Sequence, residues 1–184
     1  MKNIILIFLT TVALKSYCQD KKSYVNYNKL TVVEGTEFVI ATVENYGKLG
    51  GTRSSYLLFA DTKSGQTTQV DLSDGGYFDN IEQIKIDELG INKIIVSAHT
   101  VDLDDKKGIN WNDPKQIIIL SVDGKVRTQI TENKFYVNTY IVNKLTGTIV
   151  IAGYYDINNN KKHDEEDKSE IMIYDLKTLK KINK

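Results

Sequence analysis

Short apolar segments rich in β-branched and aromatic residues recur along the chain, separated by turn sequences such as Ser64-Gly65, Asp123-Gly124 and Thr146-Gly147. None of them extends into the longer periodicity of an amphipathic helix. Their length and composition are typical of β-strands. The pattern predicts an all-β protein with strands over residues 37–43, 94–98, 117–120, 148–152 and 171–174.

Several of these segments are continuously apolar, whereas a strand with one solvated face alternates apolar and polar residues. The segments 94–96 and 117–120 show this most clearly. A strand needs two apolar faces only when both are covered. The sequence therefore predicts sheets that stack on one another.

The chain also contains an internal repeat, because a shift of 54 residues overlays its second third on its last third without a gap. A looser copy comes first, with 38–43 and 56–59 in the places of two strands. We therefore predict three repeats, over about 30–72, 77–131 and 135–184. The overlay pairs Ile95 with Ile149, Asp102 with Asp156, Asp113 with Asp167, and segment 117–119 with 171–173.

Units of four strands that recur at this spacing are typical of propeller blades. The predicted fold is about three four-stranded antiparallel, propeller-like blades; a β-sandwich with two similar hairpins is the alternative. A closed propeller normally has at least about four blades. Three blades must therefore close tightly, stay open or pair with a second copy, unless the segment 24–27 adds a strand over one end.

An acidic loop of twelve residues, 156–167, is the main candidate for chemistry. Oxygen-bearing side chains at its alternate positions match the spacing with which a wound loop binds calcium, a cation that takes six to eight oxygens. Lys161 stands at the sixth position, where glycine is usual, and a solvated hairpin loop is the alternative. The predicted ligands are Asp156, Asn158, Asn160, the backbone carbonyl of Lys162, Asp164 and Asp167.

The second repeat has a corresponding loop, predicted to be a weaker calcium site formed by Asp102, Asp104, Asn110 and Asp113. Lys106 stands at its fifth position, where a positive charge opposes a metal ion and can replace it by pairing with the aspartates. Trp111 lies in the same loop. It is either a residue that closes the end of the core or an exposed platform for a sugar or a protein.

The N-terminal residues 1–18 read as a secretory signal peptide, with Lys2 before a short apolar stretch and small residues at Ser16 and Cys18. We therefore expect a periplasmic or extracellular protein whose mature part, from Gln19, has no cysteine. Lipidation at Cys18 is the less favoured alternative, because the residues before it do not form a lipobox.

Composition excludes some partners. The chain of 184 residues carries 24 basic and 24 acidic residues, and loss of Lys2 and Lys15 with the leader leaves a net charge of −2. Such a balance gives no field that would attract nucleic acid. No apolar run after the leader reaches the ~20 residues of a transmembrane helix.

Recognisable catalytic motifs are absent from the sequence. Of its two histidines, His99 ends an apolar strand and is expected to be partly buried with its polar atoms hydrogen-bonded, whereas His163 lies in the acidic loop and is expected to face solvent. We therefore expect a protein that is not an enzyme. A glycosidase built on Asp104 and Asp113 is the alternative.

The segments from Gly108 to Lys125 and from Ile171 to Thr178, each preceded by an acidic loop, resemble blades of secreted bacterial WD40-like/TolB-like propellers over about residues 77–184. The resemblance implies a scaffold that binds other molecules. We expect a protein partner or a homodimer. An immunity or inhibitor protein directed against a toxin, and a carbohydrate-active or glycan-binding protein, are the alternatives.

Overall fold

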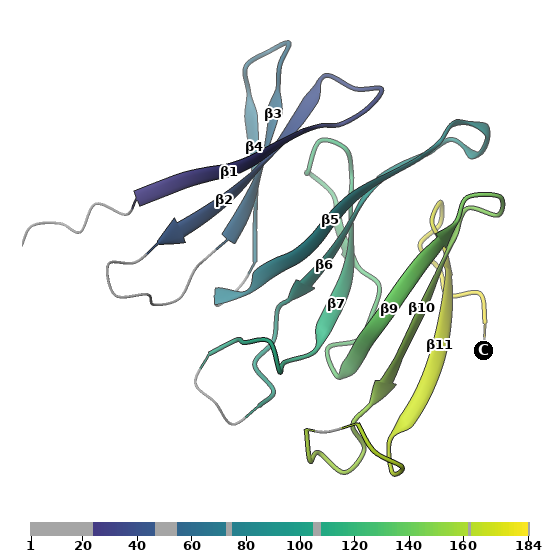
Figure 1. The fold of residues 1–184 in the computed structure, drawn as a ribbon. Helices are drawn as coiled ribbons and strands as arrows, with labels where there is room; N and C mark the ends of the chain where they lie inside the picture. The colour runs from purple at the N-terminus through teal and green to yellow at the C-terminus, as the bar shows by residue number, and fades with distance from the viewer. Residues whose placement is uncertain (1–23, 47–54, 73–74, 105–107, 162, 184) are drawn as a thin grey trace, which may run out of the picture.

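The computed structural model describes residues 24–46, 55–72, 75–104, 108–161 and 163–183 (Figure 1). Within these residues β-strands dominate, and η2 (Asp87–Leu89) is a short 3-10 turn. No helix in the described part of the chain is long and apolar enough to cross a membrane. The predicted leader, residues 1–18, lies outside the described residues.

The strands form three antiparallel sheets, each in chain order. The first sheet contains β1 (Tyr24–Val32), β2 (Phe38–Tyr46), β3 (Ser55–Asp61) and β4 (Thr67–Asp71). The second contains β5 (Tyr77–Ile86), β6 (Ile91–His99), β7 (Lys115–Leu120) and β8 (Arg127–Gln129). The third contains β9 (Phe135–Asn143), β10 (Thr148–Tyr155) and β11 (Lys168–Asp175).

The predicted all-β fold with three antiparallel, blade-like sheets is confirmed. In the third sheet the place of the fourth strand is taken by a short segment that makes a single bridge, between Lys181 and Tyr174. The side chain of Asn183 extends this contact, accepting a hydrogen bond from the Ile173 amide and donating one to the Ile171 carbonyl. The C-terminal segment therefore covers the edge of β11.

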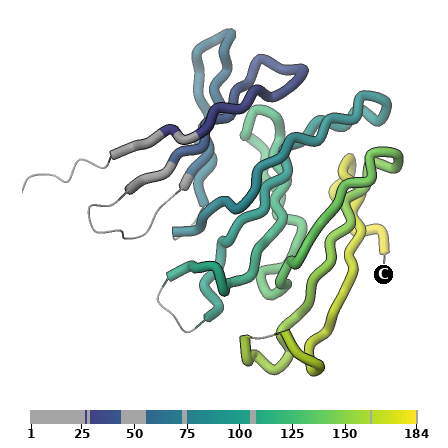
Figure 2. The backbone as a smooth tube through the Cα atoms, viewed as in Figure 1, coloured from purple at the N-terminus to yellow at the C-terminus, as the bar shows by residue number. Residues whose placement is uncertain are grey.

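The sheets stack in chain order, with the second sheet between the other two (Figures 1 and 2). Two apolar cores result. The first core joins the first and second sheets and includes Ile40, Leu57, Phe59, Val70, Ile94, Val96, Ile118 and Leu120. The second core joins the second and third sheets and includes Ile84, Ile95, Ile117, Ile119, Phe135, Ile149, Ile151 and Met172.

Strand β6 shows why the second sheet needs continuous apolar sequence. Ile94 and Val96 point into the first core, while Ile95 points into the second. All three are at most 1% exposed. The prediction that such segments are covered on both faces is confirmed.

Each sheet carries one extra residue at the same place in its first strand, a β-bulge. The extra residue falls between Tyr27 and Lys29 in β1, between Phe78 and Asn80 in β5, and between Val137 and Thr139 in β9. The residues that pair immediately before the bulge are therefore equivalent, and they are Val43, Ala98 and Gly153.

These equivalences correct the sequence overlay, which placed Ile95 on Ile149. Because the bulges align Ala98 with Gly153, Ile95 corresponds to Val150, and the gapless overlay is one residue out along β6 and β10. The acidic loops and the strands after them keep the original overlay. A single residue is therefore lost between β10 and its loop.

The corrected overlay shows that the sheets repeat in one orientation. Ile40 of the first sheet and its equivalent Ile95 of the second both face the next sheet in the stack. Val96 of the second sheet and its equivalent Ile151 of the third both face the preceding sheet. Each joint between sheets thus combines the same two kinds of face.

The first sheet begins earlier than the predicted first repeat. Residues 24–27 were predicted to add a separate strand over one end, but they form the start of β1 and pair with β2. The four strands of the first sheet therefore run from Tyr24 to Asp71.

Candidate metal centre

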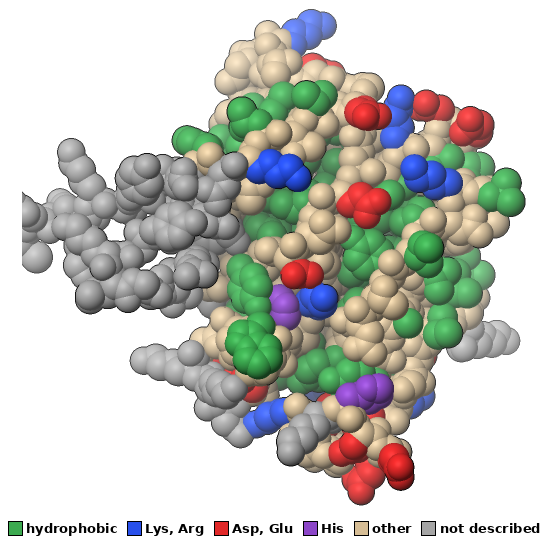
Figure 3. Space-filling view, in the orientation of Figure 1, with side chains coloured by type: hydrophobic (Ala, Val, Ile, Leu, Met, Phe, Trp, Pro, Cys, Tyr) green, Lys and Arg blue, Asp and Glu red, His purple; other side chains and the backbone are tan. Residues whose placement is uncertain are grey.

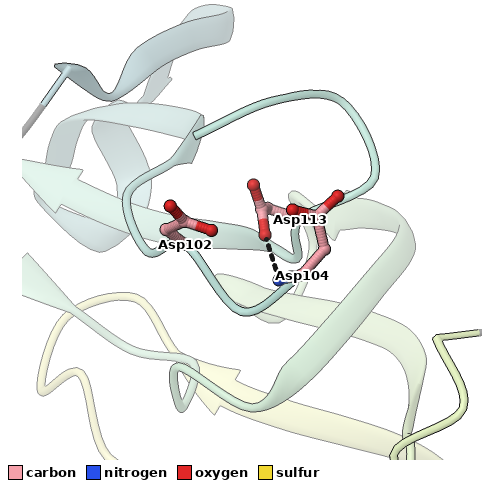
Figure 4. Close-up of side chains that lie close together, drawn as sticks. All are labelled: Asp102, Asp104 and Asp113. Atoms are coloured by element: carbon pink, nitrogen blue, oxygen red, sulfur yellow. Dashed lines mark hydrogen bonds between the residues drawn. The ribbon is translucent and has the colours of Figure 1, made fainter. Parts of the chain in front are cut away.

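Three aspartates come together in the loop between β6 and β7 (Figure 4). Asp102, Asp104 and Asp113 each offer a carboxylate oxygen, and these oxygens all lie within 4.8 Å of one another. Asp113 is 3% exposed, Asp104 is partly buried and Asp102 is exposed. We call this group the aspartate triad. Like charges held this closely repel one another, so a cation between them would stabilise the loop.

The buried Asp113 carboxylate organises the loop. Its Oδ1 accepts hydrogen bonds from the amides of Leu103 at 2.8 Å and Asp104 at 3.0 Å. Its Oδ2 accepts one from the Asn110 amide at 2.8 Å. A side chain at the end of the loop therefore fixes the backbone at its beginning and middle.

The other predicted ligands of this loop lie around the same centre. Asp102 Oδ2 accepts a hydrogen bond from the Gly108 amide at 2.9 Å, and the Asn110 side chain donates to Asp104 Oδ2 at 3.1 Å. Gly108 has a φ of +87°, which is readily adopted only without a side chain. The structure therefore brings together all four residues predicted here, while Lys106 lies outside the described residues.

The loop of the third repeat is wound in the same way. Asp167 accepts hydrogen bonds from the amides of Ile157 at 3.2 Å and Asp164 at 3.0 Å, as Asp113 does from Leu103 and Asn110. Lys161 donates its amide to Asp156 Oδ2 at 2.8 Å and has a φ of +64°. The sixth position therefore takes the conformation that glycine normally provides.

The side chains of this third-repeat loop are arranged differently. The amide groups of Asn158 and Asn160 donate to the carboxylate of Asp164, and that of Asn158 also reaches Glu166 at 3.1 Å. The hydrogen bond from Asn160 is the main cause that lowers the pKa of Asp164 below its ordinary value. Two side-chain amides thus bond to Asp164, whereas in the second-repeat loop the side-chain amide of Asn110 bonds to Asp104.

The sequence and the structure therefore favour different loops as the metal site. The sequence favoured 156–167 because it offers more oxygen ligands, yet among the described residues the close group of carboxylates lies in the other loop. The difference is burial, since Asp113 is 3% exposed whereas its equivalent Asp167 is half-buried. The predicted ligand Lys162 lies outside the described residues.

His99 borders the aspartate triad without joining it. Its ring is 6% exposed and stacks on Tyr77 with 4.7 Å between ring centroids, and its Nδ1 lies 2.8 Å from the Asp113 carbonyl. Burial lowers the pKa of His99 below its ordinary value. The prediction of a hydrogen-bonded histidine is confirmed, and the residue is buried more deeply than the partial burial that was predicted.

Trp111 is 80% exposed, so the prediction that it closes the end of the core is wrong. Its loop turns at Asn110, whose side-chain oxygen accepts a hydrogen bond from the Asn112 amide at 3.0 Å. The backbone on either side of the indole is thereby held in place, and the side chain points outward. The geometry therefore agrees with the alternative prediction, an exposed platform.

A row of aromatic rings, which was not predicted from the sequence, lies on the third sheet. Tyr136 stacks on Tyr154 with 5.0 Å between centroids, and Tyr154 stacks on His163 at 4.1 Å. His163 is exposed, as predicted. The pair Tyr136–Tyr154 occupies the positions that Tyr77 and His99 occupy in the second sheet. The signal was therefore present as an aromatic pair repeated beside the bulges of the second and third sheets.

Comparison with known proteins finds no family model that matches the chain and no curated protein that is significantly similar to it. The function is therefore argued from the geometry described above.

Proposed function

We propose that this chain is an exported, non-enzymatic binding module of propeller-like build, in which calcium fixes the loop 102–113. The observation that supports the proposal is the aspartate triad, which gathers three carboxylates around one point with Asp113 almost fully buried. The proposed location is the periplasm or the extracellular space.

Calcium suits this loop better than the other common hard cation. It accepts irregular sets of oxygen ligands at about 2.3–2.6 Å, whereas magnesium demands near-octahedral geometry and holds its water. The triad supplies three carboxylates from a loop whose backbone is already wound by hydrogen bonds to Asp102 and Asp113. Binding would therefore relieve charge repulsion without refolding the loop, which is the effect of a structural ion.

The same geometry argues against a glycosidase built on Asp104 and Asp113. Asp113 is 3% exposed, so a sugar ring cannot be placed beside its carboxylate, whereas a small ion held between the three aspartates can still contact one of its oxygens. A general acid or base must be within hydrogen-bond reach of its substrate. Asp113 is therefore a structural residue.

A binding role is supported by the apolar side chains on the two outer faces of the stack. Leu30 and Val32 on the first sheet are 70% and 64% exposed, and Ile141 and Ile171 on the third are 69% and 58% exposed. Apolar patches of this kind mark interaction surfaces. Trp111, 80% exposed beside the triad, favours a glycan as the alternative ligand.

Thermal unfolding in calcium, in magnesium and in chelator tests the proposed ion. Calcium should raise the melting temperature of the unaltered chain, and Asp104→Asn should remove most of that rise because it deletes one charge of the triad. Asp164→Asn is the matched control, since it removes an exposed acid of the other loop and should leave the rise intact. Equal melting in calcium and chelator, or loss of the rise in the control variant alone, would contradict the proposal.

A further inference from the structure

We infer that two copies of this chain join through the ends of their stacks, the outer face of the third sheet of each copy packing on the outer face of the first sheet of the other. The two chains would complete a ring of six sheets. The inference rests on the binding role proposed above and names its partner as a second copy of the chain.

The outer face of the third sheet has the character of a face that another sheet covers. By the alignment of the bulges, Val150 and Ile173 correspond to Ile95 and Ile119, which are at most 2% exposed in the second core. In the third sheet the same face reaches solvent, with Ile171 58% exposed. Figure 3 shows hydrophobic side chains at the surface on the right of the molecule, where the third sheet lies in Figure 1.

The outer face of the first sheet has the complementary character. Val39 and Ala41 correspond to Ile94 and Val96, which in the second sheet face the preceding sheet and are at most 1% exposed. Leu30 pairs with Ala41 on this outer face and is 70% exposed. Ala41 itself is buried, and the exposed part of this face lies along β1, where Leu30 and Val32 present to solvent the kind of face with which the second and third sheets contact their predecessors.

The chain already forms this joint twice within itself. The first sheet packs on the second, and the second on the third, each time with the same two kinds of face in the same order. The two end faces are the halves of a third such joint. Since they lie at opposite ends of one stack, they can meet only between molecules (Figure 1).

The area argues for a closed pair rather than a single contact. A strand of eight residues, such as β10, is about 27 Å long, and three or four strands are about 15–19 Å wide, so one end face covers roughly 400–500 Å². A stable interface takes about 800 Å² from each partner. A ring of two chains uses both end faces of each copy and so reaches that area. A head-to-tail contact that closes in this way also avoids growing into a filament.

The molar mass of the mature chain, from Gln19, measured by light scattering over a range of concentrations, tests whether two copies associate. The unaltered chain should have twice the monomer mass. Ile171→Asp on the third sheet and Leu30→Asp on the first should each give monomers, because each removes one half of both joints. Leu145→Asp is the matched control: Leu145 is 88% exposed but lies in the turn between β9 and β10, off both faces, so this variant should stay dimeric.

Mixing the two monomeric variants separates this joint from other dimers. An Ile171→Asp chain keeps an intact first sheet and a Leu30→Asp chain keeps an intact third sheet, so the mixture should recover one joint and form a weaker dimer with one chain of each kind. Native mass spectrometry with one variant isotopically labelled would count them. A Leu30→Asp variant that still dimerises alone would show that third sheets pair with each other and would overturn the inference, as would an unaltered chain that is monomeric throughout.

The same measurement in chelator keeps this inference distinct from the proposed calcium site. The faces that join do not include the aspartate triad, so the dimer should persist when calcium is removed. A dimer without any calcium effect on melting would leave the inference standing and remove the proposed ion. Circular dichroism of each variant tests whether its sheets remain folded.

Discussion

Gly124, in the turn between β7 and β8, lies against Phe59 of the first sheet. Its φ of +74° is one that side chains disfavour, and a Cβ placed there would lie 2.5 Å from Cδ2 and 2.9 Å from Cε2 of Phe59. The Phe59 ring is fully buried in the first core and has no room to withdraw. We therefore expect Gly124→Ala to strain both the turn and the joint between these sheets.

Two terms set the size of the effect. The left-handed backbone conformation costs an alanine about 1–2 kcal/mol, and overpacking a rigid core adds about 1–3 kcal/mol. The free energy of unfolding should therefore fall by roughly 2–5 kcal/mol. For a domain of this size each kcal/mol lowers the melting temperature by about 2–4 °C, so a drop of roughly 4–20 °C is expected.

Gly65→Ala provides the matched control, because Gly65 has a φ of +75° and no atom within 4 Å of the position of its Cβ. Denaturant unfolding of both variants separates the backbone cost from the overpacking cost, since Gly65→Ala has the backbone cost alone. The difference between them, about 1–3 kcal/mol, measures the contact with Phe59. If Gly124→Ala is no more destabilising than Gly65→Ala, the first sheet does not pack on the second as described.

Three further changes test other parts of the structure. Gly153→Ala places a Cβ against the Tyr136 carbonyl oxygen at the bulge and should destabilise the chain by at least ~2 kcal/mol in denaturant unfolding. The pKa of Glu170 is lowered mainly by its hydrogen bond from Lys181, so the ionised side chain stabilises the fold above pH 4.5 and loses this effect as the pH falls. Glu170→Gln should therefore lower the free energy of unfolding by ~0.2–1 kcal/mol near neutral pH. It should also make that free energy less dependent on pH below 4.5. Trp111→Ala should change stability by less than ~0.5 kcal/mol, because the indole is 80% exposed, and a large loss on thermal unfolding would contradict its outward placement.

The strands and their stacking could be predicted from the sequence because a strand that is buried on both faces has a continuously apolar sequence. Segment 117–120 could be apolar throughout only in a strand with no solvated face, and residues 117–120 of β7 are at most 2% exposed. The third repeat was less regular than predicted. Its fourth strand is reduced to a bridge at Lys181, in a C-terminal segment whose lysines and asparagines do not distinguish a strand from a covering loop.

The gapless overlay of the second and third repeats shows the limit of matching side chains alone. Isoleucine and valine alternate so closely in β6 and β10 that a slip of one residue still pairs apolar with apolar, although it exchanges the two faces. The bulge fixes the register, and it is defined by pairing between strands. The sequence does not show which residue is left without a partner.

The ranking of the acidic loops was limited in the same way. Counting oxygen-bearing side chains favours 156–167, but it carries no information about depth below the surface. Asp113 is buried beside His99 and the end of β6, a contact that only the folded sheet creates. The placement of all four second-repeat ligands around one centre follows from this anchoring.

The central position of β6 determines how the molecule can open. Its alternate side chains belong to different cores, so the first sheet can separate while Ile95 stays packed against the third, and the third can separate while Val96 stays packed against the first. Amide hydrogens of β6 would then exchange with solvent only when both ends have come apart, whereas those of β1 and β11 would exchange through partial openings that leave the middle intact. The slowest-exchanging amides of the protein should therefore lie midway along the stack.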